Sequence, residues 1–265
     1  MYSAPQLAIK YLRYYLTASN GKGHGIHSPF IFKFITRVLN DHTLYKEYDK
    51  VEKLRQQLLN DRTVLNVLDF GAGSSLTKAN QRSVASIVKN AAKSKKLAQL
   101  LFRMVRTYQP GNILELGTSL GITTSYLSLA KPDTKLVTLE GAEEVAAIAK
   151  RNFTFLELQN ISLVEGNFDN ILSSVIPGLS SVDFSFIDGN HRKEPTERYF
   201  YQLLNKVHND SILVFDDIHW SREMEQAWET IRNHPSARCT IDLFFIGIVF
   251  FRQEFHEKQH FSIRF

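Results

Sequence analysis

Three aspartates directly follow two short apolar runs of the chain. Asp188 follows residues 182–187, and Asp216-Asp217 follow residues 211–215. Both runs are expected to be parallel strands, whose carboxyl ends meet at the edge of a sheet where ligands bind. Three carboxylates without sulfur ligands or clustered histidines suit a hard divalent cation such as Mg²⁺. The alternative for Asp217 is a cap on the following helix or a pair with a basic residue.

Further polar side chains stand near these aspartates in the sequence. His191 lies three residues after Asp188, and because an imidazole titrates near neutrality it could act as a general base. The alternative is a histidine that only hydrogen-bonds its own loop. Arg192 could hold an anionic substrate. His219 and Trp220 are predicted to line an acceptor pocket, although Trp220 could equally belong to the core.

A second group of residues has the layout of a nucleotide-type site. Residues 113–116 read as a strand, followed by a turn with the spacing Gly117-x-x-x-Gly121 and then a helix. This spacing differs from the Gly-x-Gly-x-x-Gly of dinucleotide sites. Glu140 ends the next strand, about 20 residues past the turn, where a carboxylate can accept both ribose hydroxyls. Glu115 suits a cationic amine. S-adenosylmethionine carries both a ribose diol and an amino-acid end.

Two other glycine-containing segments could contribute to a site. The stretch 69–75, which contains Gly71 and Gly73, is spelled like a nucleotide loop, but no acidic strand end follows it. It is predicted to be a turn at the mouth of the site. His24 and His27 flank a flexible glycine segment, which is predicted to be a lid over the acceptor site. The alternative for that segment is a turn that connects two helices.

From residue 112 onward, short apolar runs alternate with helical patterns. This alternation predicts an α/β fold of Rossmann-like type, with a mostly parallel seven-stranded sheet covered on both faces and a C-terminal antiparallel hairpin. Strands are predicted over 113–116, 135–139, 161–164, 182–187, 211–215, 238–244 and 246–252. Helices are predicted over 121–130, 142–153, 170–175, 195–207 and 222–232.

The first 110 residues read as helices and loops, because their apolar residues recur at helical spacing. Ser28-Pro29 is a favourable helix start, with serine as N-cap and proline in the first turn. We therefore predict an N-terminal helical extension or lid over 1–110 and a cofactor-binding domain over 111–265. Helices of the extension are predicted over 7–16, from 29, and over 45–59, 81–92 and 95–108.

The composition is that of an ordinary globular protein, with 43% hydrophobic and 22% charged residues in 265. No apolar run reaches the length of about 18 residues that a spanning helix needs. One cysteine, Cys239, excludes an intrachain disulfide, and a reduced, cytoplasmic protein is expected. Between Phe70 and Leu114 there are eight basic residues and no acidic ones. This stretch is either a solvated helix face or a surface for an anionic partner.

Taken together, the motifs resemble those of class I S-adenosylmethionine-dependent methyltransferases, and most closely the branch of catechol and caffeoyl-coenzyme A O-methyltransferases. The resemblance covers roughly residues 101–252. Its motifs are Leu-Glu-Leu-Gly-x-x-x-Gly at 114–121, Glu140, Gly166-Asn167-Phe168, Phe-Ile-Asp-Gly-Asn-His at 186–191 and Val-Phe-Asp-Asp at 214–217.

The resemblance implies transfer of a methyl group to a hydroxyl of a small molecule, with help from Mg²⁺ or another divalent cation. It implies metal binding by Asp188, Asp216 and Asp217 and a catalytic role for Asp188 and His191. The chain departs from the branch at Asp217, where asparagine is usual, and at His191, where a general-base lysine is usual. Cofactor contacts are implied for Glu115, Gly117, Thr118, Ser119, Gly121, Glu140, Gly141, Asn167, Phe168 and Asp188.

Two alternative functions remain at this stage. One is an RNA methyltransferase that uses the basic stretch 70–114 as its electrostatic footprint, although the sequence contains no recognised RNA-binding module. The other is a non-catalytic protein that binds the cofactor and interacts with partners. The three acidic residues at the strand ends argue against this last alternative.

Overall fold

The computed structural model describes residues 1–25, 27–67 and 81–265. The glycine loop 69–75 therefore lies outside the described residues. The chain divides into two compact units, one formed by Met1–Asp41 with Ser173–Phe265 and the other by His42–Leu172. The boundary at residue 110 stays a prediction, whereas the contacts group the first 41 residues with the C-terminal part of the chain. No helix among the described residues is both long and apolar enough to cross a bilayer.

The unit His42–Leu172 contains three parallel strands in the order β3-β4-β5. Helix α5 packs on α6, and α3 packs on both α4 and α6. A short antiparallel pair, β1 with β2, lies beside α7. The elements are α3 (Lys46–Leu59), β1 (Val64–Asn66), β2 (Gln81–Ser83), α4 (Val84–Ala91), α5 (Lys95–Tyr108), β3 (Asn112–Leu116), α6 (Ile122–Ala130), β4 (Lys135–Glu140), α7 (Glu143–Phe155) and β5 (Ile161–Glu165), followed by α8 (Phe168–Val175).

The unit that combines both ends of the chain contains five strands in the order β10-β8-β9-β7-β6. Strand β6 is parallel to β7 and β8 to β10, while β9 is antiparallel to both of its neighbours. The elements are α1 (Ala4–Thr17), α2 (Pro29–Phe34), a π-helical turn (Ile35–Leu39), a 3₁₀ turn (Ile176–Gly178), β6 (Phe184–Ile187), α9 (Lys193–Leu204), β7 (Ile212–Asp216), α10 (Arg222–Asn233), β8 (Cys239–Asp242), β9 (Ile246–Phe250) and β10 (Gln259–Ser262).

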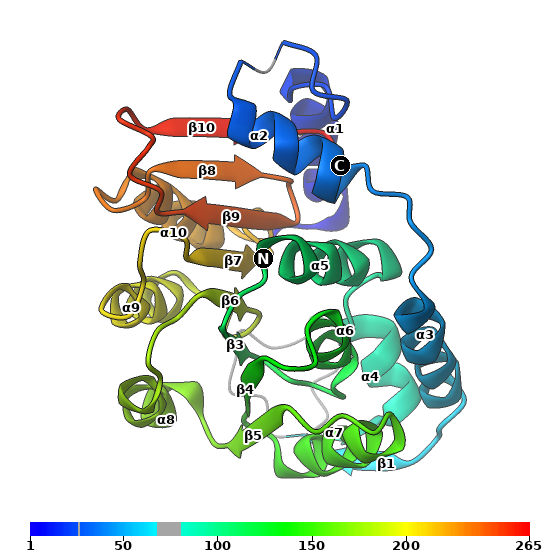
Figure 1. The fold of residues 1–265 in the computed structure, drawn as a ribbon. Coiled ribbons are helices and arrows are strands. Elements are labelled where there is room, and N and C mark those ends of the chain that lie inside the picture. Colours follow the sequence, from blue (N-terminus) through cyan, green and yellow to red (C-terminus); the bar gives the residue numbers. More distant parts are fainter. Residues whose placement is uncertain (26, 68–80) are drawn as a thin grey trace. The chain divides into compact units, whose positions relative to one another are not determined.

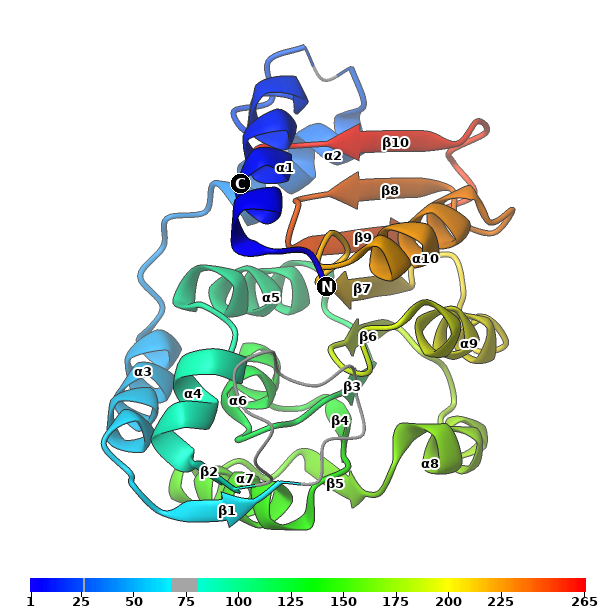
Figure 2. The ribbon, with the colours of Figure 1, turned by 180° about the vertical axis from the view of Figure 1, so that it is seen from behind.

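Helices cover both faces of these C-terminal strands, with α2 on one side and α10 on the other (Figures 1 and 2). The ring of Phe30 in α2 meets Phe250 of β9 edge-on, at 4.9 Å between centroids. On the opposite face, a Cβ added at Gly247 of β9 would lie 2.6 Å from the Trp228 ring of α10, so only glycine lets that helix approach so closely. The predicted α/β layering, the mostly parallel strands and the antiparallel pair β8–β9 are confirmed.

Two parts of the strand prediction were wrong. Residues 81–83 form strand β2 rather than the start of a helix, because Ser83 is the N-cap of α4 and accepts a hydrogen bond from the Ser86 amide at 3.2 Å. Strand β10 is an addition to the seven strands predicted. Its sequence, Gln-His-Phe-Ser, lacks the alternation of apolar and polar residues that predicts a strand. Its pairing with β8 could therefore not be predicted from the local sequence.

Helix α6 begins at a residue that has to be glycine. Gly121 has φ +79°, and a Cβ placed there would lie 2.5 Å from the Phe153 ring of α7. This close approach brings the glycine turn after β3 against α7, and it fixes where the turn 117–121 runs.

We expect Gly121→Ala to lower the free energy of unfolding by about 1–3 kcal/mol, because it adds a strained left-handed residue and a clash with Phe153. Gly178→Ala is the matched control, since a Cβ there would meet nothing within 4 Å, and it should change stability by less than about 0.5 kcal/mol. Urea denaturation of the two variants measures both values. Equal midpoints for the two would contradict this account of the turn.

Candidate functional site

The ends of β3 and β4 are joined by hydrogen bonds from the glycine turn. The amides of Gly117 and Thr118 both donate to the carbonyl of Leu139, at 3.0 and 3.1 Å. Glu140 follows, and its carboxylate accepts from the Ser119 amide at 2.7 Å. The structure thus brings together the turn residues and the strand-end acid that the sequence analysis had grouped, while their role in cofactor binding stays a prediction.

The carboxylate of Glu140 is held by backbone groups. Besides the bond from Ser119, it accepts from the amide of Ala142 at 2.9 Å. Burial raises the pKa of Glu140, and the hydrogen bonds from Ala142, Ser119 and Gly141 partly offset that rise. Each carboxylate oxygen can accept more than one hydrogen bond, so Glu140 retains capacity for hydroxyl donors.

Glu115 is completely buried in β3, an unusual place for a carboxyl group. Its Oε2 accepts from the hydroxyls of Thr124 and Thr138, at 2.5 and 2.6 Å. Its Oε1 has no hydrogen-bond donor within the described part of the chain. Burial raises the pKa of Glu115 to about 7, against the opposing effect of the two threonines. A cationic ligand group would satisfy both the free oxygen and the charge.

The remaining predicted cofactor residues lie after β5. The Gly166 amide donates to the carbonyl of Glu140 at 2.8 Å, which ties this turn to the end of β4. Asn167 accepts from the Asp169 amide through its side chain at 3.0 Å, and Phe168 begins α8. The side chain of Asn167 therefore has a local role in the turn, independent of any ligand.

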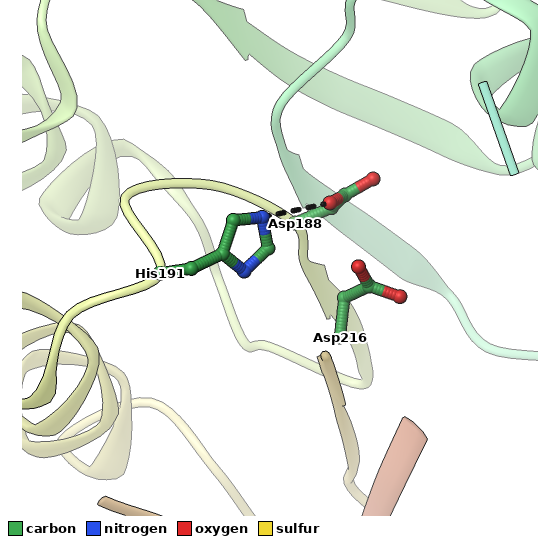
Figure 3. Close-up of side chains that lie close together, drawn as sticks. All are labelled: Asp188, His191 and Asp216. Carbon is green, nitrogen blue, oxygen red and sulfur yellow. Dashed lines mark ion pairs between the residues drawn. The ribbon is translucent and has the colours of Figure 1, made fainter. Parts of the chain in front are cut away.

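Asp188 and Asp216 are neighbours because of the register of their strands. In the parallel pair β6–β7, Ile187 lies opposite Phe215, so the next residue of each strand is an aspartate at the same edge. His191, on the loop before α9, points its ring toward both carboxylates (Figure 3). Its Nε2 lies 3.5 Å from Oδ1 of Asp188, and one potential ligand atom of each residue lies within 4.8 Å of the others.

Asp217 lies outside this group of three. Its φ is +53°, and its amide donates to the carbonyl of Phe245 at 2.7 Å while its carbonyl accepts from the Trp220 amide at 2.9 Å. The backbone of Asp217 therefore shapes the loop after β7. Its service as a metal ligand stays a prediction, as does the place of Arg192 beside the substrate.

His219 is enclosed by two carboxylates. Its Nε2 lies 2.8 Å from Oδ2 of Asp242 and its Nδ1 lies 3.1 Å from Oε1 of Glu225, while Phe244 stacks on the ring at 5.1 Å. Burial would lower the pKa of His219, but Asp242 and Glu225 together outweigh it and raise that pKa. Both ring nitrogens of His219 thus help to hold this loop, and its contact with substrate stays a prediction.

The network continues to the N-terminal helix, which the sequence analysis did not connect with this loop. Glu225 also accepts from Lys10 Nζ at 2.8 Å and from the Tyr2 hydroxyl at 2.7 Å. The Tyr2 amide donates to the carbonyl of Trp220 at 3.1 Å. No local sequence pattern signals partners separated by more than 200 positions, so these contacts were missed.

The basic stretch 70–114 is only partly a solvated surface. Lys89, Lys95 and Lys96 are exposed, but Arg103 is buried and the guanidinium of Arg106 lies 4.9 Å from the centre of the Tyr45 ring. Lys78 lies outside the described residues, and attraction of an anionic partner by the stretch stays a prediction. The lid role of His24 and His27, both exposed, also stays a prediction.

Residues 114–218 match the model of a family described as a methyltransferase domain, Methyltransf_24. The matched segment runs from β3 to just beyond β7 and includes both groups of acids described above. A catechol O-methyltransferase of Niastella koreensis is 30% identical over 152 residues, which are 56% of this chain. The match spans 65% of that relative, a little less than two thirds of its length.

Solved structures of methyltransferases have a similar fold. The SAH-bound methyltransferase PaMTH1 of Podospora anserina has a TM-score of 0.59 at 12% identity, and the comparison covers 95% of this chain and 98% of that one. The O-methyltransferase TomG of Streptomyces achromogenes, in complex with SAM, has a TM-score of 0.56 at 16% identity, covering 79% and 91%. The predicted Rossmann-like methyltransferase fold is confirmed.

The raised pKa of Glu115 predicts a pH-dependent stability of the ligand-free protein. A carboxyl group that binds its proton more tightly when folded stabilises the fold at low pH, and this contribution is lost as pH rises from about 4.5 to about 7. We therefore expect Glu115→Gln to be more stable than wild type above neutral pH, by up to about 3 kcal/mol.

Urea denaturation between about pH 5 and 8 measures this difference. The exposed Glu143 provides the control variant Glu143→Gln, which should follow the wild-type profile. If Glu115→Gln shows the same pH dependence of stability as wild type, then ionisation of the buried Glu115 does not destabilise the fold.

The raised pKa of His219 also predicts a contribution to stability that is lost as pH rises, but in a higher pH range than that of Glu115. The protonated ring stabilises the fold fully below about pH 6.5, and this stabilisation disappears as pH rises through the higher pKa of the folded protein. Asp242→Asn should reduce that decline. His234, whose pKa is lowered by burial and by Lys258, contributes in the opposite sense, so His234→Gln should make the decline steeper. Denaturation profiles with identical slopes in all three proteins would refute the assignment.

Proposed function

We propose that this chain transfers the methyl group of S-adenosylmethionine to a hydroxyl of a small molecule. The observation that carries the proposal is the fully buried Glu115, whose Oε1 has no hydrogen-bond donor among the described residues. This carboxylate stands just before the glycine turn, within the segment that matches a methyltransferase domain. The catechol O-methyltransferase of Niastella koreensis supports oxygen as the acceptor atom.

The residues of the unit His42–Leu172 fit this cofactor. The amino group of S-adenosylmethionine would be held by Glu115, and its ribose hydroxyls by Glu140. The turn would approach the ligand closely, because two of its residues are glycines without a side chain. Its contacts would come from Gly117, Thr118, Ser119 and Gly121. Gly141, Asn167 and Phe168 would complete the contacts from the ends of β4 and β5. The bound cofactor supplies an electrophilic methyl group.

The residues at the ends of β6 and β7 have the task of preparing the acceptor. Asp188, Asp216 and the predicted ligand Asp217 would hold a divalent cation, which lowers the pKa of an acceptor hydroxyl. His191 is placed to interact with the same hydroxyl, and its Nε2 lies 3.5 Å from Oδ1 of Asp188. Arg192, His219 and Trp220 stay our proposed contacts with a small, anionic acceptor.

We also propose that the protein works in the cytoplasm. Cys239 is buried, and burial raises the pKa of its thiol to about 12, which makes it unreactive. A chain with one inert thiol needs no oxidising compartment.

The test is calorimetry with S-adenosylhomocysteine together with labelled methyl transfer to catechol. Glu140→Ala removes a carboxylate that would bind the ribose, so we expect the affinity to fall about 10- to 100-fold. Glu143→Ala, which alters an exposed acid three positions further on, should retain wild-type affinity. Unchanged affinity for Glu140→Ala would place the cofactor elsewhere.

Labelled methyl transfer into a fractionated cell extract, in place of catechol, separates the alternative functions. Tight cofactor binding without transfer to any small molecule of a cell extract would favour the non-catalytic protein. Label found in the RNA fraction, with binding weakened by salt, would favour the RNA methyltransferase.

A further inference from the structure

One geometric detail of the aspartate pair points beyond a general divalent-cation site. The distance of 3.5 Å between Nε2 of His191 and Oδ1 of Asp188 is longer than a charge-assisted hydrogen bond, which spans about 2.7–2.9 Å. Two neighbouring ligands of one metal ion, each at about 2.1 Å from it, are separated by about 3.0–3.5 Å. The two side chains form an ion pair by distance, and their spacing also matches that of two ligands of one metal ion.

The third donor completes a compact set. Asp216 is only 1% exposed, and one of its carboxylate oxygens lies within 4.8 Å of the ligand atoms of both other residues. In Figure 3 the three side chains come from the end of β6, from the following loop and from the end of β7, and they face a common space.

The arrangement of the backbone keeps these donors where they are. The register between β6 and β7 sets Asp188 beside Asp216. On the His191 loop, Asn190 has φ +50° and its side-chain amide donates to the Tyr199 hydroxyl of α9 at 3.2 Å. The histidine thus sits on a loop anchored to a helix, as a preformed ligand requires.

The identity of the donors decides which ions fit. Mg²⁺ binds oxygen almost exclusively, whereas an imidazole nitrogen beside carboxylates suits divalent ions of the first transition series. We infer that Asp188, His191 and Asp216 form a mixed nitrogen–oxygen site for such an ion, with His191 as a ligand rather than as the general base. This inference rests on the proposed function for its use, since the ion would activate the acceptor hydroxyl.

Metal binding can be measured on the full chain without cofactor or acceptor. After treatment with chelator, the protein is titrated with Mn²⁺, followed by electron paramagnetic resonance, and with Co²⁺, followed by its visible absorption. We expect one bound equivalent of each ion, and a tenfold excess of Mg²⁺ should fail to displace the Mn²⁺. Displacement of the Mn²⁺ by this tenfold excess of Mg²⁺ would overturn the inference, as would the absence of binding.

Three variants assign the nitrogen ligand. His191→Gln should weaken Mn²⁺ binding about tenfold or more and shift the Co²⁺ absorption. His191→Asp replaces the nitrogen by oxygen, and should restore binding with a preference moved toward Mg²⁺. His208→Gln is the control, because His208 also pairs with an aspartate, Asp183, at 2.9 Å but lies outside the cluster.

Wild-type Mn²⁺ affinity and Co²⁺ spectrum in His191→Gln would overturn the inference and return His191 to the role of base. Thermal melts of each variant show whether it is folded. Because the calorimetry with S-adenosylhomocysteine depends on Glu115 and Glu140, failure of the metal site leaves that result untouched, and failure of cofactor binding leaves the metal titrations valid.

Discussion

The candidate site depends on one constraint, the parallel register of β6 and β7. Since Ile187 lies opposite Phe215, the first residue beyond each of these positions is an aspartate at the same sheet edge. A shift of either strand by one residue would turn its aspartate to the other face of the sheet. The four residues of β6 and all of β7 are buried, and this apolar packing fixes the register. The chemistry at the edge is therefore positioned by side chains that take no part in it.

The loop after β7 is restrained from three elements. Asp242 of β8 and Glu225 of α10 hold His219, while Tyr2 and Lys10 reach Glu225 from the N-terminal segment. Glu225 accepts hydrogen bonds from three side chains, and the pKa of its carboxyl is lowered because these partners outweigh its burial. The N-terminal helix thus belongs physically to the part of the chain that bears Asp216.

Local pattern predicted most elements of the fold, because apolar runs and caps are short-range signals. The serine cap at Ser28, helix α5 and the positions along the chain of strands β3 to β9 all followed from neighbouring residues. The grouping of Ser119 with Glu140 followed from the rule that parallel strands end at one edge. The rest depends on partners far apart in the chain. Neither the attachment of Lys10 to Glu225 nor the pairing of β10 with β8 leaves a trace in local sequence.

The split composition of one unit affects how the protein can fold during synthesis. The segment Met1–Asp41 is made roughly 130 residues before its partners in Ser173–Phe265 begin to emerge. At about 5–20 residues per second, the wait is on the order of 10 s. The unit His42–Leu172 is continuous, so all of its residues are made within that interval. The surface of α1 that later meets Phe244 and Glu225 lacks these partners until they are made, so this helix is open to aggregation or chaperone binding meanwhile.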